Sequence, residues 1–295
     1  MALKKIAVLL VLSFGLAADL TGGRELAVTQ VAPSARALAL GNAYAAHKPD
    51  AASFLWNPGA LAFNEKKEVA TIQTKLATEV DFFGLSGIWP LDWCNLGVYW
   101  AQLQIADMPE TAASLNNNEV EILSKLTYYE NTAVLAAARK IFDSLGLGVS
   151  LRQTSQRISS DYGYGSGWAG AAGLYYQWNR LTLGLAANNI NAYQQYDTGY
   201  LEHLPQTYTA GIGLQILDNL AVYYDRQQIE KTERNYAGLE IFLTPRINLA
   251  VGYMDDRFTA GAGLTLEHVY FDYAYAAQNK STLGSDQYIS LGVRW

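Results

Sequence analysis

From about Glu68 to the end of the chain, apolar residues alternate with small or polar residues in a period of two. Residues 145–152 show the pattern well, because leucines and a valine alternate with glycines, a serine and an arginine. The same alternation recurs at 207–216, 247–253 and 269–275. Since successive side chains of a strand point to opposite faces, these segments predict strands with one apolar and one small or polar face. A membrane barrel and a soluble sandwich both fit this period.

The connections between the expected strands alternate in length, which favours a barrel. The short ones are 267–268, 244–245, 218–219, 179–180 and 142–144, and the long polar ones are 278–284, 227–234, 191–205, 158–166 and 104–131. Residues 254–257 are an exception, a short connection where a long one is expected. Tight turns on one rim and long loops on the other are typical of outer-membrane barrels, whose tight turns face the periplasm. Counting back from Trp295 to Glu68 gives about 14 strands, each close to the ~9 to 11 residues that a tilted spanning strand needs.

The composition agrees with strands in a membrane. Hydrophobic residues make up 50% of the 295 residues and charged residues 16%, with 20 Tyr, 7 Trp and 25 Gly. Aromatic residues are common in strands and in the girdles that barrels place at membrane interfaces. The net charge of -6 and the pI near 5.1 argue against a nucleic-acid binder, which normally carries a basic stripe. The expected partner is therefore outer-membrane lipid.

The first 18 residues have the pattern of a cleaved signal peptide. Lys4 and Lys5 precede the apolar run 6–12, and small residues follow at 15–18. The apolar run is shorter than the ~18 residues needed to span a bilayer, so an anchor is disfavoured. We expect the mature protein to be exported. Its one cysteine, Cys94, cannot form an intramolecular disulfide, so the fold must hold without one.

Residues 19–67 lack the strand period and predict a separate element. Ser34 is a candidate N-cap for a helical run over 35–40 that Gly41 ends, and Asn57-Pro58-Gly59 marks a turn. A barrel of about 14 strands is wider than the eight-stranded barrels that side chains fill, and narrower than open porins. Because such a lumen leaks unless something fills it, we predict that 19–67 is a plug, or hatch, inside a barrel formed by 68–295.

The last strand carries a possible assembly signal. Ile289, Leu291, Val293 and Trp295 share one face, and the chain ends on the aromatic residue. A terminal aromatic on an alternating strand resembles the signal that the outer-membrane barrel assembly machinery reads. The sequence thus predicts that machinery as a second partner.

Two further groups of residues are candidate functional positions in the wall. Five charged residues fall at positions expected to face the lumen, where they would pair with one another or hold the hatch, because a charge facing lipid at mid-depth costs ~2 to 4 kcal/mol. They are Arg152, Asp225, Glu240, Asp272 and Arg294. Gly84, Gly87 and Pro90 of the second expected strand are candidates for a kink that opens a lateral gap, although packing and a strand end also explain them.

Catalysis and metal binding are not expected. His47, Asp50 and Ser53 have a spacing that could imitate a catalytic triad, but nothing in a plug fixes their geometry. His203 and His268 fall in connections, where solvated surface is the default. No cysteine or histidine cluster has metal-ligand spacing. The chain is therefore expected to be no enzyme and to use no cofactor.

The N-terminal segment resembles a known family. Residues 34–44 and 50–61 are similar to the N-terminal region of PorV/PorQ-like proteins within the long-chain fatty-acid transporter (FadL) superfamily. The residues that carry the resemblance are Arg36, Gly41, Asp50, Trp56, Asn57, Pro58 and Gly59, with a glycine where the family usually has alanine. The similarity continues through 258–266, 271–275 and 290–295.

The resemblance implies a 14-stranded barrel with an N-terminal hatch. FadL-like members admit hydrophobic small molecules through the hatch and a lateral gap in the wall, whereas PorV-like members receive secreted proteins in type IX secretion. We therefore expect an outer-membrane barrel that passes hydrophobic molecules or acts as a secretion accessory. The alternative is a soluble periplasmic or surface β-protein with a binding or structural role.

Overall fold

The wall of the molecule is a single antiparallel sheet. The computed structural model describes residues 26–76, 80–113, 120–159, 163–254, 256–277 and 286–295, so the signal peptide expected at 1–18 lies outside the described residues. The strands are β1 (Glu68–Leu76), β2 (Val80–Pro90), β3 (Asn95–Ala113), β4 (Val120–Phe142), β5 (Leu145–Ile158), β6 (Tyr164–Trp178), β7 (Leu181–Tyr196), β8 (Leu201–His203), β9 (Thr207–Leu217), β10 (Leu220–Ile229), β11 (Thr232–Thr244), β12 (Ile247–Met254), β13 (Arg257–Leu266), β14 (Val269–Ala276) and β15 (Asp286–Arg294).

The sheet closes on itself. Each strand of the wall pairs with its neighbours in sequence, β1 pairs with β15 from Glu68↔Arg294 to Lys75↔Gln287, and β6 pairs with β7. The three-residue strand β8 pairs with β7 alone and stands outside the ring, which leaves fourteen strands in the wall among the described residues. The expected fold class, an all-β barrel of about 14 strands, is confirmed. Two stacked sheets, the architecture of a soluble sandwich, are excluded.

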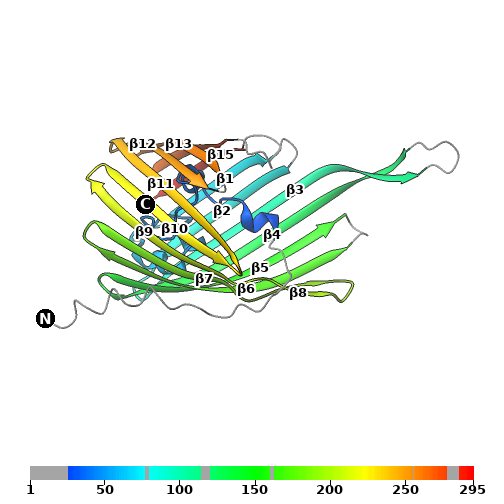
Figure 1. Ribbon diagram of the computed structural model, residues 1–295, viewed down its shortest axis with the longest axis horizontal. Helices are drawn as coiled ribbons and strands as arrows, with labels where there is room; N and C mark the ends of the chain where they lie inside the picture. The colour runs from blue at the N-terminus through cyan, green and yellow to red at the C-terminus, as the bar shows by residue number, and fades with distance from the viewer. Residues whose placement is uncertain (1–25, 77–79, 114–119, 160–162, 255, 278–285) are drawn as a thin grey trace.

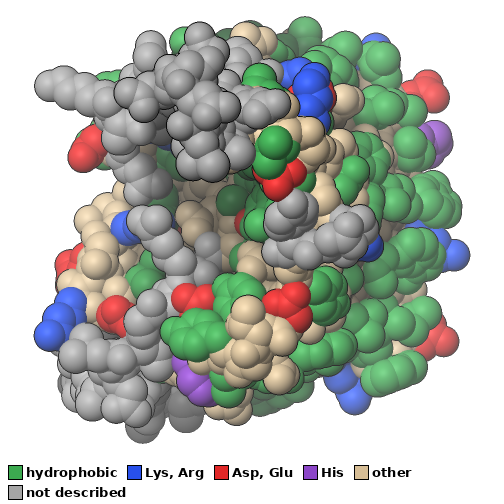
Figure 2. Space-filling model, turned by 90° about the vertical axis from the view of Figure 1, so that its right-hand side faces the viewer, with side chains coloured by type: hydrophobic (Ala, Val, Ile, Leu, Met, Phe, Trp, Pro, Cys, Tyr) green, Lys and Arg blue, Asp and Glu red, His purple; other side chains and the backbone are tan. Residues whose placement is uncertain are grey.

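The two faces of the wall differ as the period of two predicts. In β12, Ile247, Leu249 and Val251 are exposed on the outside, whereas Asn248 and Ala250 are buried inside. Figure 2 looks onto one rim and shows hydrophobic side chains gathered along the flank of the barrel. The apolar side chains therefore form an outer belt, and the small and polar ones face the lumen.

The rims differ in their connections. One rim, the turn rim, carries short connections at 143–144, 179–180, 218–219, 245–246 and 267–268, at the left of Figure 1. Asn179 and Glu267 adopt the left-handed conformation, with φ of 52° and 47°, as tight turns require. The other rim, the loop rim, carries the remaining connections. The expected short turns are confirmed.

Three expected long loops are wrong, one of them 191–205, where β7 continues to Tyr196 and pairs with β8. At 227–234, strands β10 and β11 continue to a turn at 230–231, and at 104–131, strands β3 and β4 extend into a hairpin that projects past the rim (Figure 1). In this projection Lys125 pairs with Asp107 at 3.0 Å, and Ser124 donates to Glu110. Both segments are polar, because a strand beyond the barrel needs no apolar face, and the sequence pattern of a strand is lost there.

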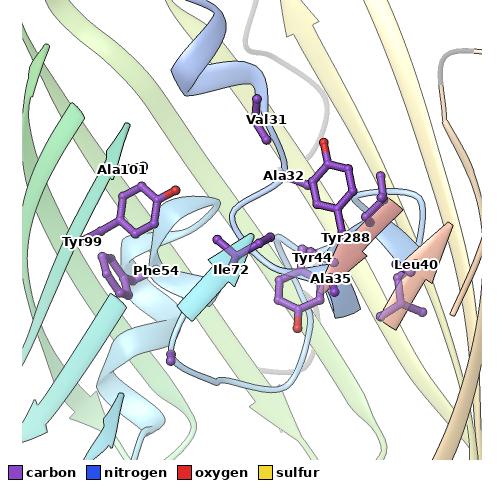
Figure 3. Close-up of a cluster of buried hydrophobic side chains, with 14 of the residues drawn as sticks. Val31, Ala32, Ala35, Leu40, Tyr44, Phe54, Ile72, Tyr99, Ala101 and Tyr288 are labelled. Carbon is purple, nitrogen blue, oxygen red and sulfur yellow. The ribbon is translucent and has the colours of Figure 1, made fainter. Parts of the chain in front are cut away.

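The N-terminal segment lies in the lumen. Residues 26–67, here called the hatch, contain α1 (Ala27–Gln30), α2 (Ala35–Ala39), η2 (Ser53–Leu55) and η3 (Pro58–Phe63). As expected, the Ser34 hydroxyl caps α2 by accepting from Ala37 N at 3.0 Å, and Gly41 follows with φ of 62°. Figure 3 shows Leu40 and Tyr44 of the hatch near Tyr288 of the wall. Within the described part of the chain, no helix is long and apolar enough to cross a membrane.

If the outer belt contacts lipid, the cost of a charge on it should depend on how deep in the bilayer the charge lies. Val251→Arg places a charge near the middle of β12 on its outer face, and should lower the free energy of unfolding in phospholipid vesicles by ~2 to 4 kcal/mol. Ile247→Arg is the matched control, because it places the same charge on the same face at the turn rim, where the cost falls to ~0 to 1 kcal/mol. Equal costs at the two positions would contradict a belt in contact with lipid.

Candidate functional site

Inward-facing carboxylates of the wall hold the backbone of the hatch. Asp225 of β10 is fully buried, and its Oδ2 accepts from the backbone N–H groups of Tyr44 and Ala45, both at 2.7 Å. Far from β10 in the strand order, Glu130 of β4 accepts from Val28 N at 2.7 Å. Backbone N–H groups buried in a loop-like segment must find acceptors, and here the wall supplies them.

A buried ion pair joins the hatch to β11. Glu240 Oε1 accepts from Arg36 Nε at 2.8 Å and from Asn248 Nδ2 at 2.9 Å, and the Glu240 side chain is 1% exposed. The other oxygen faces His47 Nε2 at 3.8 Å, and the His47 ring stacks on Tyr44 with centroids 4.0 Å apart. A buried charge is tolerated only when it is paired, so Arg36 and Glu240 fix each other's position.

A second buried cluster lies where the barrel closes. Glu68 of β1 accepts from Arg294 Nε of β15 and from the Tyr270 hydroxyl, both at 2.8 Å, and from Ala51 N of the hatch at 3.1 Å. One carboxylate thus joins the first and last strands and holds the hatch at the same point.

The aromatic-Asn-Pro turn and Asp50 organise the hatch from within. Asn57 Nδ2 donates to Ala45 O at 2.9 Å and to Leu174 O of β6 at 3.0 Å, while its Oδ1 accepts from Gly59 N. Asp50 accepts from the backbone of the following turn and from the Tyr44 hydroxyl. Burial, together with the charge of Asp50, holds the pKa of Tyr44 well above its usual value. This hydroxyl therefore stays a hydrogen-bond donor.

Inward glycines of the wall let the hatch backbone approach. A Cβ added at Gly148 of β5 would lie 2.2 Å from the Pro58 carbonyl oxygen, and one at Gly252 of β12 would lie 2.2 Å from Gly41 N. Both neighbours are backbone atoms, so they cannot move without shifting the hatch. A single methyl group added at either glycine would therefore displace the hatch backbone.

The five charged residues expected in the lumen all lie on inner faces. Asp225, Glu240 and Arg294 hold the hatch or its seam, as described above. Asp272 of β14 is buried, and Arg152 of β5 donates to the side-chain oxygen of Asn189. Two of them contact the hatch directly, Glu240 at Arg36 and Asp225 at Tyr44, and Arg294 is linked to Ala51 of the hatch through Glu68.

Strand β2 is regular at Gly84, Gly87 and Pro90, the candidate positions for a kink that opens a lateral gap. Strand β2 keeps an unshifted register with β1 from Glu68↔Ile88 to Leu76↔Val80, and with β3 from Val80↔Ile105 to Pro90↔Asn95. The two glycines instead make room for neighbours. A Cβ at Gly84 would meet Ile72 and Tyr99, and one at Gly87 would meet the Trp89 ring.

The wall is irregular between β6 and β7, where the alternation of residues predicted a regular strand. Pairing jumps from Trp168↔Tyr193 to Gly170↔Ile190 and then to Ala172↔Ala187, so β7 carries extra residues. Asn189 and Asn191 adopt positive φ of 58° and 50°. The asparagine-rich stretch 188–191 was the available signal, because asparagine tolerates this conformation better than most residues. Leu204 N bonds Ala192 O, and Asn189 Nδ2 donates to Pro205 O, both at 3.0 Å.

Two cavities flank the hatch. The loop-side basin has a volume of about 330 Å³ and is lined by the start of the hatch, by Leu55 and Trp56, and by Gly170, Asn188 and Asn189 of the irregular wall. The turn-side basin has a volume of about 600 Å³ and is lined by Lys48 and Phe63 on the hatch, and by residues of β6, β7, β9 and β10. The hatch separates the two basins, and the loop-side basin reaches the irregular part of the wall.

His47, Asp50 and Ser53 do not form a triad. The Ser53 hydroxyl donates to the backbone oxygen of Asp50, whereas His47 faces Glu240. Among the residues that the structure describes, no group of three histidine, cysteine or acidic side chains is placed to hold a metal ion.

Comparison with known proteins identifies the fold. No family model and no curated protein matches the chain. The structure is similar to the Pseudomonas putida toluene transporter TodX, with a TM-score of 0.62 and 11% identity over 88% of this chain and 96% of that one. It is also similar to a deltaS2 mutant of the TodX monoaromatic hydrocarbon channel, with a TM-score of 0.60 and 13% identity over 88% and 97%. At these identities the likeness establishes a shared fold.

The buried pair generates a prediction about hatch anchoring. Glu240→Gln leaves the half-buried Arg36 without its counter-charge, and the cost should be below the ~3 to 5 kcal/mol of breaking a fully buried pair. We expect faster hydrogen exchange at the backbone amides of residues 36–47. Glu233→Gln, which removes the same charge from an exposed pair with Arg226, is the control and should change little. Identical exchange rates in the two variants would rule out an anchoring role for Glu240.

The close approach at Gly148 generates a second prediction. Gly148→Ala pushes a methyl group into the Pro58 backbone and should cost about 1 to 3 kcal/mol, with protease cleavage of a displaced hatch as the readout. Gly170→Ala is the matched control, because a Cβ there meets nothing closer than Ile190 O at 3.4 Å. If both variants resist protease equally, the hatch is not held at Gly148.

Proposed function

We propose that this chain is an exported outer-membrane channel for small hydrophobic molecules, with the hatch as the barrier in its lumen. The observation that carries the proposal is the pair of basins on either side of an anchored hatch, inside a closed barrel with an apolar outer belt. A soluble protein rarely exposes an apolar patch of more than a few hundred Å², so a belt around the whole barrel favours a membrane.

Aromatic side chains at both rims support the membrane assignment. Exposed aromatics lie at the turn rim, at Trp93, Phe142 and Trp178, and toward the loop rim, at Tyr164, Trp168 and Phe258. Barrels place such girdles at the two interfaces of the bilayer and turn their short connections toward the periplasm. In this orientation the loop-side basin opens to the outside and the turn-side basin to the periplasm.

The irregular β6–β7 seam is the proposed route through the wall. The loop-side basin extends to Gly170 and Asn189 at this seam, where the regular ladder is interrupted. A hydrophobic molecule that leaves the basin here enters the bilayer without passing the hatch. The name of TodX, a toluene transporter, is consistent with a cargo of this kind.

A secretion accessory role is the second candidate. It is supported by the PorV/PorQ-like residues of the hatch and by the projecting β3–β4 hairpin, whose outer part pairs with no other described strand. Assembly by the barrel assembly machinery is proposed for either role. Ile289, Leu291 and Val293 lie on the outer face of β15, and the exposed Trp295 follows. Co-purification of exported proteins with the native barrel would favour the accessory role.

Uptake of toluene by cells tests the channel. Cells with an intact lipopolysaccharide layer should take up labelled toluene faster when they express this protein. Gly170→Leu places a bulky side chain at the β6–β7 seam and should return uptake toward that of cells without the protein.

Ala260→Leu is the control for this experiment, because the same side chain is added to an exposed position of β13 away from the seam. Outer-membrane fractionation and heat-modifiable gel migration check that each variant is assembled. Extraction of the wild-type protein by mild salt, or uptake that does not respond to its expression, would overturn the proposal.

A further inference from the structure

A contact between two side chains crosses the irregular β6–β7 seam on the luminal side. Arg152 of β5 donates a hydrogen bond to the side-chain oxygen of Asn189 of β7, although β6 lies between these two strands. In the ladder Arg152 is paired with Ala169 of β6, whose side chain is a single methyl group. The small side chain of Ala169 leaves room for the guanidinium group to pass over β6. Because Arg152 is charged, this hydrogen bond is stronger than one between two neutral groups.

Asn189 also holds the segment that follows β8. Its Nδ2 donates to Pro205 O at 3.0 Å, and the residue is 1% exposed. Pro205 lies in the connection between β8 and β9. One amide group thus accepts from β5 and donates to the chain that leads into β9. These contacts link the wall on the two sides of the seam.

Backbone pairing is interrupted at the place that these contacts span. Gly170↔Ile190 stands alone between two register jumps, whereas β2 pairs with β3 without a shift from Val80 to Pro90. A jump leaves the extra residues of the bulged strand without a ladder partner. Asn189 is one of these residues and has no partner in β6. Its side chain therefore supplies a link that the ladder lacks there.

The seam lies between the loop-side basin and the edge of the outer belt. Gly170 lines the basin and lies two residues from Trp168, so the two share a face of β6. Trp168 is 45% exposed, and exposed aromatics mark the interfaces of a bilayer. Gly170 has no side chain to cover the wall at this depth. Arg152 and Asn189 line the same basin, so their contact lies on the inner side of the seam.

We infer that the contact between Arg152 and Asn189 is a latch, which keeps the seam closed when it is made and opens the seam when it breaks. The inference rests on the proposed route through the seam and adds the residues that regulate it. The latch does not include the contacts that hold the hatch at β1, β10 and β11, so it can break while the hatch stays in place. It therefore sets the rate at which cargo passes from the basin to the bilayer.

Removal of the Asn189 side chain tests the latch. Asn189→Gly deletes both contacts and suits the backbone, because glycine adopts the φ of 58° without strain. Uptake of labelled toluene should rise by up to roughly tenfold, the factor that corresponds to the loss of one charge-assisted hydrogen bond. Asn191→Gly is the matched control, since Asn191 has a similar φ of 50° but is exposed and lines neither basin. Equal uptake in the two variants would overturn the inference.

A second variant and a second probe separate the latch from general damage. Arg152→Met keeps a long side chain, removes the guanidinium group and should also raise toluene uptake. Uptake of a labelled trisaccharide should stay at the wild-type level in both variants, because the hatch still closes the lumen. Heat-modifiable migration checks that each variant is folded. Entry of the trisaccharide would indicate a displaced hatch and would overturn the assignment of the effect to the seam.

A disulfide across the seam should have the opposite effect. A Cβ at Gly170 would lie 3.7 Å from Ile190 Cβ, within the ~3.5 to 4.5 Å that a disulfide requires. The double variant Gly170→Cys and Ile190→Cys also carries Cys94→Ser, which removes the chain's own cysteine. Oxidation should cross-link the seam and abolish toluene uptake, and a reductant should restore it. The same protein after reduction is the control.

The cross-linked barrel also separates this inference from the function on which it rests. If cross-linking abolishes uptake while Asn189→Gly behaves as the wild type, the latch is overturned and the route through the seam stands. Uptake that persists after complete cross-linking would overturn the route and the latch together. Loss of toluene uptake by the wild-type protein would instead remove the channel function itself.

Discussion

The structure depends on closure of the sheet. When β1 pairs with β15, the ring of strands has no open edge, and every strand can satisfy its backbone hydrogen bonds with its neighbours. Closure also separates an outside from an inside, so the period of two along each strand becomes an apolar belt and a polar lumen. The buried Glu68 meets the partly exposed Arg294 at this closing pair, and Glu68 holds the hatch as well.

A barrel of fourteen strands has a lumen too wide for the side chains of the wall to fill, and the hatch fills it. The hatch in turn has backbone groups that need hydrogen-bond partners. Its backbone is mostly irregular, and so brings many N–H and C=O groups into a buried space. The wall meets them with inward carboxylates and amides, such as Asp225 and Asn95, and with glycines that allow close approach.

The contacts that hold the hatch and the interruption of the wall lie at different places in the barrel. The hatch is held by buried charges at β1, β10 and β11, on strands whose ladders are continuous in the region of contact. The interruption of the wall lies elsewhere, between β6 and β7, where Asn189 and Asn191 adopt positive φ beside the loop-side basin. The route proposed through this seam leaves the hatch contacts at β1, β10 and β11 in place.

The sequence by itself determined the strands, the short turns, the helical cap at Ser34 and the face on which each charged residue lies. All of these follow from local spacing, because a strand alternates every two residues and a turn is chosen by a few neighbours. In the β3–β4 projection apolar residues no longer alternate with polar ones, so the sequence predicted a loop where the structure has strands.

Only the tertiary structure decided which partners those residues meet. Arg36 and Glu240 are 204 positions apart, and Tyr44 and Asp225 are 181 apart, so no local pattern joins them. The β6–β7 seam and the two basins likewise arise from how strands shift against one another and around the hatch. Local sequence sets the direction of a side chain, and closure of the barrel sets what lies opposite.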